Sequence, residues 1–434
     1  MKRLSILIFV ITALNLQSIA SVTITGSTKE VITERPAQST GLDKVFVVYN
    51  TDGCSATYTS STSSTVKWFR FSNLGGGYAQ EVTGIIHNEN EWTLPRLEGD
   101  MGYIIEEGTS RHYVWVVNYA AHRMRADAIT PSPEQECDMS ALIFNGAAPR
   151  INYYTINGRQ MELGRDIEIA YKTLTYSEST GSFVQEDVVR QFSSLESTIH
   201  VPAPYCDTAF ELSGDRFLKA WGEEIVLSSP TLKATAVNAV TSVQQEQRVS
   251  SNEKRPENES GLGGSAPATV DFNASVTDAA VFTEWQFSRD PEFNDISLRF
   301  NELDVTYTFR DEGETYVRFV CANDQGTCEY SSETYTVQIG RSSLECPNAF
   351  SPGASEGVND EWKVSYQSII DFDCHIFNRW GKELARLTDP SQGWDGKVGG
   401  KVVPAGVYFY VITATGADGK KYKLSGDINV INYR

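Results

Sequence analysis

Short runs in which apolar and polar residues alternate recur along this chain of 434 residues. Clear examples lie at residues 44–49, 65–71 and 112–119, and they are rich in Val, Phe, Tyr and Trp. Successive side chains of a β-strand point to opposite faces of a sheet, so this pattern is typical of strands. We therefore expect an all-β protein built from tandem β-sandwiches.

Residues 41–130 contain several of these runs and are expected to form the first sandwich. Cys54 is followed by Trp68, which resembles the strand B cysteine and strand C tryptophan of immunoglobulin-like domains. The second cysteine of those domains is absent from residues 114–119. The resemblance is therefore one of architecture only.

Two polar stretches flank the next part of the chain. Residues 130–136 contain two prolines and are interpreted as a linker. Residues 137–243 are expected to form a second β-sandwich, with strands at 167–176 and 217–227. Residues 244–266 are polar and rich in Gly and Ser, which fits either a flexible linker or a long exposed loop.

Residues 267–340 repeat the strand pattern of the first segment and are expected to form a third sandwich. This segment resembles the PKD family of immunoglobulin-like surface modules, whose Trp-x-Phe strand is present as Trp285 and Phe287. A Ser-Arg-Asp stretch follows where that family has a Gly-Asp-Gly turn. We therefore describe the segment as PKD-like.

Residues 345–434 contain several short motifs in a fixed order. The motif residues are Pro347, Asn348, Ala349, Phe350, Ser351, Pro352, Gly357, Asn359, Asp360, Phe377, Asn378, Arg379, Trp380, Gly381, Trp394, Asp395, Gly396, Gly406 and Tyr408. Together they resemble the gliding motility-associated C-terminal family (CHU_C) of Bacteroidetes, the type B sorting domain of the type IX secretion system. The resemblance covers about one fifth of the chain.

The residues of this segment predict a small immunoglobulin-like β-sandwich. Trp362, Trp380 and Trp394 are expected to fill its interior. The strand-like residues 406–416 and 421–431 flank an Asp-Gly pair, which is typical of a tight hairpin. The loop after Pro352 departs from the Asn-Gly-Asp-Gly of the family, which puts a cation site there in doubt.

The N-terminus predicts export. Lys2 and Arg3 precede an apolar run at residues 4–16, and Ser18 and Ala20 are small residues placed as in a cleavage site. This arrangement is typical of a secretory signal peptide, here residues 1–20. The apolar run is shorter than the roughly 20 residues that a membrane-spanning helix needs.

The formal net charge is −19, and the charge is unevenly distributed. Residues 346–434 carry ten basic and ten acidic side chains, so the whole excess of negative charge lies in the residues before 346. We call this preceding part of the chain the passenger. An acidic passenger is repelled by nucleic-acid phosphates and by anionic lipids. We therefore expect no nucleic-acid partner.

Two covalent features are predicted. A turn centred on residues 324–325 would place Cys321 opposite Cys328, so we expect a disulfide between them. Thr208 lies in an Asp-Thr-Ala sequence that matches the short pattern of Bacteroidetes O-glycosylation. The sequence leaves open the pairing of Cys54, Cys137, Cys206, Cys346 and Cys374.

The chemistry of known catalytic motifs is not found in the sequence. The five histidines are scattered and give no zinc-binding spacing, and the glycines at 75–77 are interpreted as a strand connection. Neighbouring carboxylates such as Glu106 and Glu107 or Glu223 and Glu224 would point to opposite faces of a strand. We therefore predict neither catalytic nor metal-binding residues, no cofactor, and a non-enzymatic protein.

Taken with these absences, the family resemblance implies a protein that crosses the periplasm and is delivered to the cell surface or secreted by the type IX machinery. Its sandwich modules would then bind a protein or glycan ligand or serve in adhesion. The alternative is a structural component of an outer-membrane assembly, docked to a PorP/SprF-like protein. A modular hydrolase is the remaining hypothesis.

Overall fold

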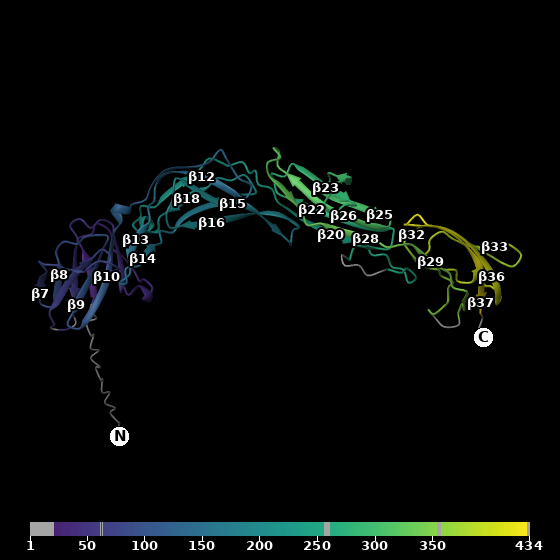
Figure 1. Cartoon of the computed structure of the whole chain (residues 1–434), viewed down its shortest axis with the longest axis horizontal. Coiled ribbons are helices and arrows are strands. Elements are labelled where there is room, and N and C mark those ends of the chain that lie inside the picture. Colours follow the sequence, from purple (N-terminus) through teal and green to yellow (C-terminus); the bar gives the residue numbers. More distant parts are fainter. Residues whose placement is uncertain (1–20, 61, 63, 256–260, 354–356, 432–434) are drawn as a thin grey trace, which may run out of the picture. The chain divides into compact units, whose positions relative to one another are not determined.

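The computed structural model describes residues 21–431 except 61, 63, 256–260 and 354–356. Nearly all of its regular structure is β-strand (Figure 1). The prediction of an all-β fold of tandem sandwiches is confirmed. The predicted signal peptide, residues 1–20, lies outside the described part of the chain. Within that part, no helix combines the length and the apolarity needed to cross a membrane.

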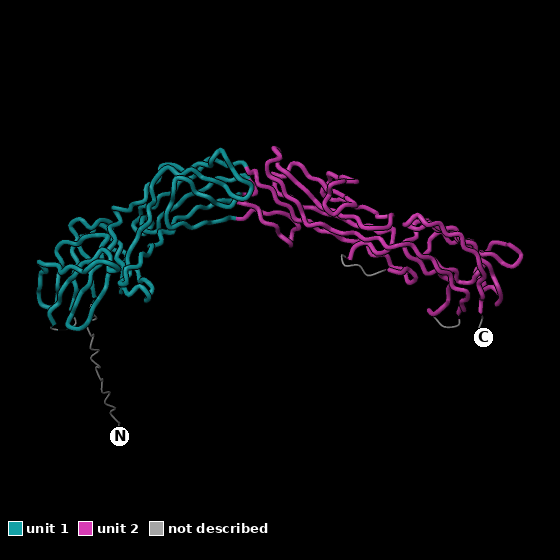
Figure 2. Tube along the Cα trace, in the orientation of Figure 1, with its two compact units in different colours: residues 1–172, 187–203, 207–233 teal, residues 173–186, 204–206, 234–434 magenta. Residues whose placement is uncertain are grey.

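The chain divides into two compact units (Figure 2). The first unit consists of residues up to 172 together with 187–203 and 207–233, and the second consists of 173–186, 204–206 and 234–434. We name four modules along the chain, and their bounds are residues 21–122 (first), 125–228 (second), 239–339 (third) and 343–431 (C-terminal).

The first module is a sandwich of two sheets, ordered β1-β4-β8-β7 and β2-β3-β10-β9-β5-β6, with β3 parallel to β10. Its sheets include β1 and β2, which precede the expected start at residue 41. The elements are β1 (Ser21–Thr25), β2 (Ile32–Glu34), η1 (Gln38–Thr40), β3 (Lys44–Val48), β4 (Ser55–Thr59), β5 (Val66–Phe71), β6 (Gln80–Glu81), β7 (Ile86–Asn88), β8 (Glu91–Leu94), β9 (Met101–Glu107), β10 (Ser110–Asn118) and η2 (Tyr119–His122).

The interior of the first module has the architecture expected from Cys54 and Trp68, and both side chains are buried there. Trp68 packs edge-on against Tyr103, with ring centroids 6.2 Å apart. The Tyr103 hydroxyl donates to the carbonyl of Glu98 at 3.0 Å. This is the tyrosine corner seen in immunoglobulin-like sandwiches.

The second module contains three sheets, ordered β11-β12-β17, β13-β14 and β16-β15-β18-β19. Residues 130–136, predicted to be a linker, instead belong to a hairpin, because β11 runs to Pro131 and Ser132 N donates to Ala141 O at 2.8 Å. The elements are β11 (Arg125–Pro131), β12 (Met139–Ala147), β13 (Ile151–Tyr154), β14 (Gln160–Leu163), β15 (Ile167–Ser177), β16 (Ser182–Phe192), β17 (Thr198–Pro202), β18 (Glu211–Gly214), α1 (Arg216–Ala220) and β19 (Ile225–Ser228).

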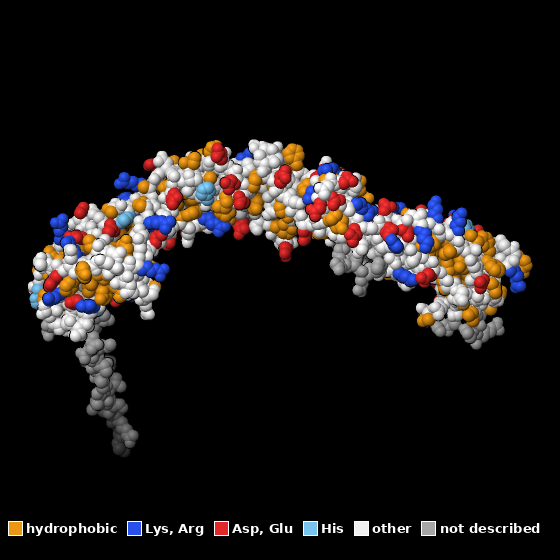
Figure 3. Space-filling model, viewed as in Figure 1, with side chains coloured by type: hydrophobic (Ala, Val, Ile, Leu, Met, Phe, Trp, Pro, Cys, Tyr) orange, Lys and Arg blue, Asp and Glu red, His pale blue; other side chains and the backbone are white. Residues whose placement is uncertain are grey.

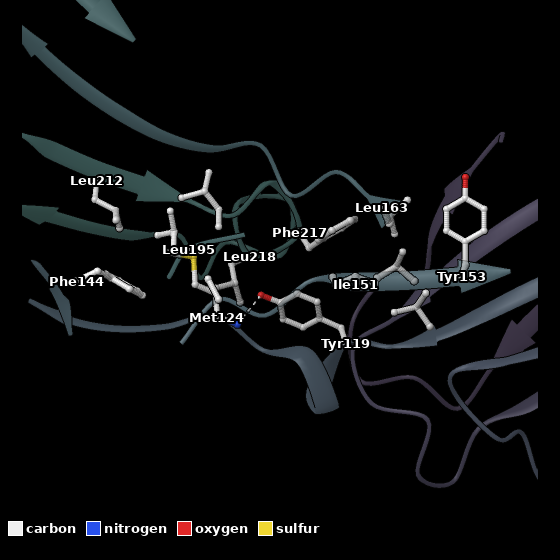
Figure 4. Packing of buried hydrophobic residues seen from close by; sticks show 14 of the residues in the cluster. Tyr119, Met124, Phe144, Ile151, Tyr153, Leu163, Leu195, Leu212, Phe217 and Leu218 are labelled. Carbon is white, nitrogen blue, oxygen red and sulfur yellow. Dashed lines mark hydrogen bonds between the residues drawn. The ribbon is translucent and has the colours of Figure 1, made fainter. Parts of the chain in front are cut away.

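The sheet that contains β3 and β10 is covered on both faces. Phe46 and Val116 face the interior of the first module, whereas Val47 and Val117 belong to a second cluster that continues into the second module. Figure 4 shows part of this cluster, with Tyr119 among residues of the second module. Burial on two faces explains why β3 and β10 are almost continuously apolar.

A buried ion pair lies at the junction of these two modules. The side chains of Arg165 and Asp215 are both fully buried, and Arg165 Nε donates to Asp215 Oδ2 at 2.7 Å. The Tyr119 hydroxyl, at the end of β10, donates to the same carboxylate at 3.0 Å. Asp215 also caps α1 by accepting from Leu218 N at 2.9 Å. The pair therefore joins both modules through one carboxylate.

A second, more exposed cluster surrounds Glu223 at this junction. Lys29 lies 2.8 Å from one carboxylate oxygen, and Arg123 lies 2.8 Å from the other. The Tyr49 hydroxyl donates to Glu223 at 2.9 Å. The hydrogen bonds from Lys29, Tyr49 and Arg123 lower the pKa of Glu223 to about 2. The carboxylate thus stays charged at neutral pH.

The third module pairs a β20-β22-β25 sheet with a larger sheet ordered β21-β28-β26-β23-β24, to which β27 adds. Trp285 and Phe287, the basis of the PKD resemblance, are buried in its core. The elements are β20 (Ala239–Gln245), β21 (Gly263–Gly264), β22 (Ala268–Val276), β23 (Phe282–Ser288), β24 (Ile296–Phe300), β25 (Asp304–Phe309), β26 (Gly313–Ala322), β27 (Glu329–Ser331) and β28 (Tyr335–Ile339).

The predicted bridge between Cys321 and Cys328 is wrong. Cys321 lies on β26 opposite Tyr330, because the Asn323 side chain accepts from Thr327 N and Cys328 N and holds a longer loop than a two-residue turn. Cys321 is a thiol whose pKa is raised to about 11 by burial. Cys328 is disulfide-bonded, as is Cys137.

The C-terminal module is built on a sheet ordered β30-β37-β36-β32-β33. The predicted hairpin is present as β36 and β37, and Gly419 adopts a left-handed φ of 72° in its turn. The elements are β29 (Ser343–Glu345), β30 (Ala349–Phe350), β31 (Ser365–Gln367), β32 (Ile369–Phe377), β33 (Glu383–Leu387), β34 (Lys397–Val398), β35 (Lys401–Val402), β36 (Gly406–Gly416) and β37 (Lys421–Val430).

The polar stretch at residues 244–266 is ordered against the C-terminal module over its described part. Asn252 donates through its side-chain amide to Val364 O at 2.7 Å and to Pro390 O at 2.8 Å. Ser368 N donates to Ser265 Oγ at 2.8 Å, and Ala266 N donates to Ser368 Oγ at 3.2 Å. We call residues 248–255 the strap. These hydrogen bonds do not fit a flexible linker, and the exposure of Val249 agrees with an exposed loop.

Removing one charge of the buried ion pair should be costly. In Asp215→Asn, Arg165 keeps an uncompensated buried charge, so we expect the free energy of unfolding of the mature chain to fall by about 3–5 kcal/mol. The double variant Arg165→Met/Asp215→Asn removes both charges and keeps the cap of α1, so it should recover most of this loss. Urea unfolding measures both, and equal losses in the two variants would contradict the explanation.

The lowered pKa of Glu107 should make the free energy of unfolding depend on pH. Burial acts to raise its pKa, but hydrogen bonds from Ser60, Thr62 and Tyr58 prevail and lower it from 4.5 to about 2. The resulting stabilisation is present above pH 4.5 and is lost as the pH falls towards 2, and it amounts to roughly 3 kcal/mol. The stability difference between wild type and Glu107→Gln should therefore shrink over this range in urea unfolding at a series of pH values. A constant difference would show that Glu107 titrates normally.

Candidate functional site

Most aromatic residues of the predicted sorting motifs form the core of the C-terminal module. Trp394 packs against Phe350 and Tyr408, with both pairs of ring centroids 5.5 Å apart. Trp362 and Trp394 exchange two backbone hydrogen bonds, and Trp362 Nε1 donates to Pro347 O at 2.7 Å. The motifs at the start, middle and end of the module thus meet in one aromatic cluster.

Several polar motif residues hold turns. The Asp360 carboxylate accepts from Gly353 N at 2.9 Å and from Gly357 N at 2.6 Å. Asn359 adopts a left-handed φ of 55°, and its carbonyl accepts from Ser351 N. Within the described residues, no group of His, Cys, Asp and Glu is arranged to hold a metal ion. Asp360 therefore binds the backbone of Gly353 and of Gly357.

The Trp394-Asp395-Gly396 motif ends where its backbone passes close to the Phe350 side chain. Gly396 has a φ of 68°, and a Cβ added there would lie 3.1 Å from the Phe350 ring. Burial acts to raise the pKa of Asp395, but hydrogen bonds from Lys397 lower it. The carboxylate accepts from Lys397 N at 2.9 Å and so fixes the turn.

The first and last motifs meet at the edge of the sheet. β30 pairs in parallel with the end of β37, where Asn429 N donates to Asn348 O at 2.9 Å. Tyr408 closes this end from β36, because its hydroxyl donates to Pro404 O at 2.9 Å. Ala349 lies on β30, Pro352 follows β30, and Gly406 is the first residue of β36. These motif residues belong to the strands that form this edge of the sheet.

Trp380 is the exception, and its predicted place in the interior is wrong. Its side chain is 78% exposed, whereas Trp362 and Trp394 are buried. The Arg379 guanidinium lies over its ring, 4.8 Å from the centroid. Exposure of so large an apolar side chain is costly, so it marks a candidate contact with another molecule.

The turn that carries Trp380 is built to present it. Asn378 Oδ1 accepts from Trp380 N and from Lys382 N, both at 3.0 Å, and Gly381 has a φ of 77°. These Asx-type bonds act together with the backbone hydrogen bond from Gly381 N to Asn378 O at 3.0 Å to close the turn. We call residues 378–381 the tryptophan turn.

An apolar stripe on the outer face of β36 begins at the same end of the sheet. Val407, Phe409 and Val411 alternate along β36 and are each more than two-fifths exposed. Phe377, the last residue of β32 before the tryptophan turn, pairs with Phe409. Figure 3 shows hydrophobic side chains gathered on this module. We call Phe377, Val407, Phe409 and Val411 the β36 stripe.

Charged residues border the β36 stripe on its β33 side. Arg386 Nε lies 2.8 Å from Asp373, and His375 lies within 3.3 Å of both Asp373 and Glu383. The hydrogen bond from Arg386 is the main cause of the lowered pKa of Asp373. An apolar strip with a polar rim is a common arrangement in protein interfaces.

Thr208, the predicted O-glycosylation residue, is only 6% exposed. Its hydroxyl accepts from Lys172 N at 2.9 Å and donates to Ala209 O at 3.2 Å. The folded second module therefore does not offer this hydroxyl to a modifying enzyme, and its position does not support the prediction.

Fold and motifs together define a modular β-sandwich protein with a C-terminal export domain. Residues 344–430 match the CHU_C type IX secretion signal domain, and residues 129–229 match a fibronectin type III domain. The chain is therefore delivered to the cell surface or the medium by the type IX secretion system, and it interacts with that machinery.

Other comparisons add no functional assignment. No curated protein matches the chain. Fibronectin(III)-like modules of Clostridium thermocellum CbhA share 12% identity, cover 44% of this chain and 95% of their own, and have a TM-score of 0.17. Dimeric latent PorU from Porphyromonas gingivalis shares 9% sequence identity with this chain. The match covers 74% of this chain and 35% of PorU, and its TM-score is 0.16.

A Ca²⁺-stabilized adhesin described as helping an Antarctic bacterium bind ice shares 10% identity. The match covers 95% of this chain and 99% of the adhesin, at a TM-score of 0.18. Scores of this size carry no argument about this chain.

The tryptophans of the C-terminal module should differ sharply in their contribution to stability. Trp394→Ala removes a buried side chain and should cost about 3–5 kcal/mol, whereas Trp380→Ala should change stability by no more than about 0.5 kcal/mol. Urea unfolding of the mature chain measures both. A cost for Trp380→Ala as large as that for Trp394→Ala would show that Trp380 is a core residue.

Proposed function

We propose that this chain is a non-enzymatic surface protein whose sandwich modules bind a partner, and that the secretion machinery contacts its tryptophan turn. The observation that carries the second part is the exposure of Trp380 beside the burial of Phe350, Trp394 and Tyr408. A residue that contributes little to the core and is nevertheless held outward by a structured turn is suited to recognition.

The modular architecture supports a binding role for the passenger. A fibronectin type III module and a secretion signal domain are both found in this chain. The cross-strand packing of each module gives a rigid platform that displays side chains on open sheet faces. Binding through such faces needs no catalytic residues.

A second candidate is a structural part of an outer-membrane assembly docked to a PorP/SprF-like protein. The β36 stripe favours it, because a permanent interface is more apolar than a transient one. Copurification of the chain with such a membrane protein, lost in Phe409→Ser, would favour this candidate. Release of the unaltered chain into the medium would contradict it.

Removal of residues 346–434 would not test the sorting role separately from folding. The strap and Ser265 would lose their partners in the C-terminal module, and Ala417, which packs in the core of the third module, would be removed. A truncated passenger would therefore stay in the periplasm and also be destabilised. A point variant separates sorting from folding.

Trp380→Ala provides that separation, with Tyr78→Ala as its control. Tyr78 is 94% exposed in the first module, so both changes delete an exposed aromatic ring. We expect Trp380→Ala to fold and cross the inner membrane but to reach the surface at a level lower by about tenfold, because a buried aromatic anchor in an interface is worth at least 1–2 kcal/mol. Tyr78→Ala should reach the surface normally.

Surface protease treatment and antibodies against the passenger measure this distribution in fractionated cells. Display of Trp380→Ala at the wild-type level would refute the role of the tryptophan turn. Equal loss of display in Tyr78→Ala would show that the effect is not specific to the C-terminal module.

A further inference from the structure

The outer face of the larger sheet of the third module carries an open groove of about 900 Å³. Its floor is formed by β23 and β26, whose outward side chains pair as Phe282 with Ala322, Glu284 with Val320 and Gln286 with Arg318. Residues of β27 line one side. The inward side chains of the same strands belong to the core of the module.

The polar part of the floor is held in one hydrogen-bonded chain. Arg318 Nε donates to Gln286 Oε1 at 2.9 Å, and Gln286 Nε2 donates to Glu284 Oε1 at 2.6 Å. Arg299 Nη1 donates to the same Glu284 oxygen at 2.5 Å. The Arg318 guanidinium also lies over the Phe293 ring, 4.1 Å from its centroid. These side chains are positioned before any ligand arrives, which lowers the entropic cost of binding.

An apolar platform lies at the other end of the groove. Phe282 is 58% exposed and Val281 is 60% exposed, and both line the groove. An exposed aromatic ring next to fixed amide, carboxylate and guanidinium groups offers a flat apolar surface and several hydrogen-bonding groups together. This combination suits a ligand that has both apolar faces and many hydroxyl groups.

The charges that line the groove indicate which class of ligand it can bind. The charged residues that line the groove are Glu284, Glu329 and Arg318, and Arg299 neutralises Glu284. The groove is thus nearly neutral in a chain whose net charge is −19. It offers no cluster of cations for an acidic ligand and no surplus of carboxylates for a basic one.

Backbone pairing argues against an extended peptide on this floor. β23 pairs with β24 and β26, and β26 pairs with β23 on one side and with β28 and β27 on the other. A peptide that adds to a sheet needs unpaired backbone groups at an edge strand. A ligand on this floor is recognised through side chains instead.

We propose that this groove binds a neutral oligosaccharide, with a sugar ring stacked on Phe282 and hydroxyl groups bound by Glu284, Gln286 and Arg318. The assignment rests on the proposed binding role of the passenger and names its ligand class.

The test uses the mature chain and an array of neutral and acidic glycans, followed by calorimetric titration with laminarihexaose, cellohexaose and mannohexaose. We expect at least one neutral glycan to bind. Phe282→Ala should weaken that binding by about tenfold or more while leaving the unfolding temperature unchanged, because Phe282 lies outside the core. Tyr78→Ala, the matched exposed aromatic, should bind as wild type does.

Failure to bind any neutral glycan, or unchanged binding by Phe282→Ala, overturns the proposal. So does binding of only acidic glycans, or a Phe282-dependent protein partner in place of a sugar. A protein partner bound through Phe282 would refute the ligand class and leave the proposed binding role of the passenger standing. Surface display of Phe282→Ala should equal that of wild type, because the groove and the tryptophan turn are in different modules.

Discussion

The first unit depends on a single buried carboxylate. Asp215 neutralises Arg165, accepts a hydrogen bond from Tyr119 and caps α1, so it links the last strand of the first module to the helix of the second. An ion pair taken out of water gains little over an apolar replacement, but its loss on one side leaves a costly charge. The doubly covered sheet of β3 and β10 follows from the same junction.

The second unit uses the strap, in which the buried Glu253 side chain pairs with Arg248 and Arg255. The strap and Ser265 form hydrogen bonds with backbone and hydroxyl groups of the C-terminal module, and Ala417 of that module packs in the core of the third. The export domain is thus a structural neighbour of the third module as well as a signal. Its outward features, the tryptophan turn and the β36 stripe, are formed by residues other than those in this contact. In the C-terminal module, the side chains that stabilise the fold are different from those that are exposed for recognition.

The strand pattern predicted the β-sandwich fold, because alternation of burial is a local property of strands such as β4 and β26. The strand predicted at residues 217–227 is wrong, because Arg216–Ala220 form α1 under the Asp215 cap and only Ile225–Ser228 form a strand. The motifs predicted the residues of the export domain, but not which of them face outward. Trp380 has the same residue type as Trp394, and only the turn built by Asn378 separates their environments. The Cys321–Cys328 prediction failed because hairpin register depends on the length of the loop, which the Asn323 side chain determines. The strap was missed because its partners lie more than a hundred residues away along the chain.

The pairing of the two ends of the C-terminal module has a consequence for biosynthesis. β37 covers β36 and also forms the parallel neighbour of β30, so residues near 349 find their partners only after residues near 429 have been made. In a polypeptide that ends before β37, the core residues Tyr408 and Ile412 of β36 lack their partners on β37. Assembly of this sheet therefore depends on synthesis of the chain through β37.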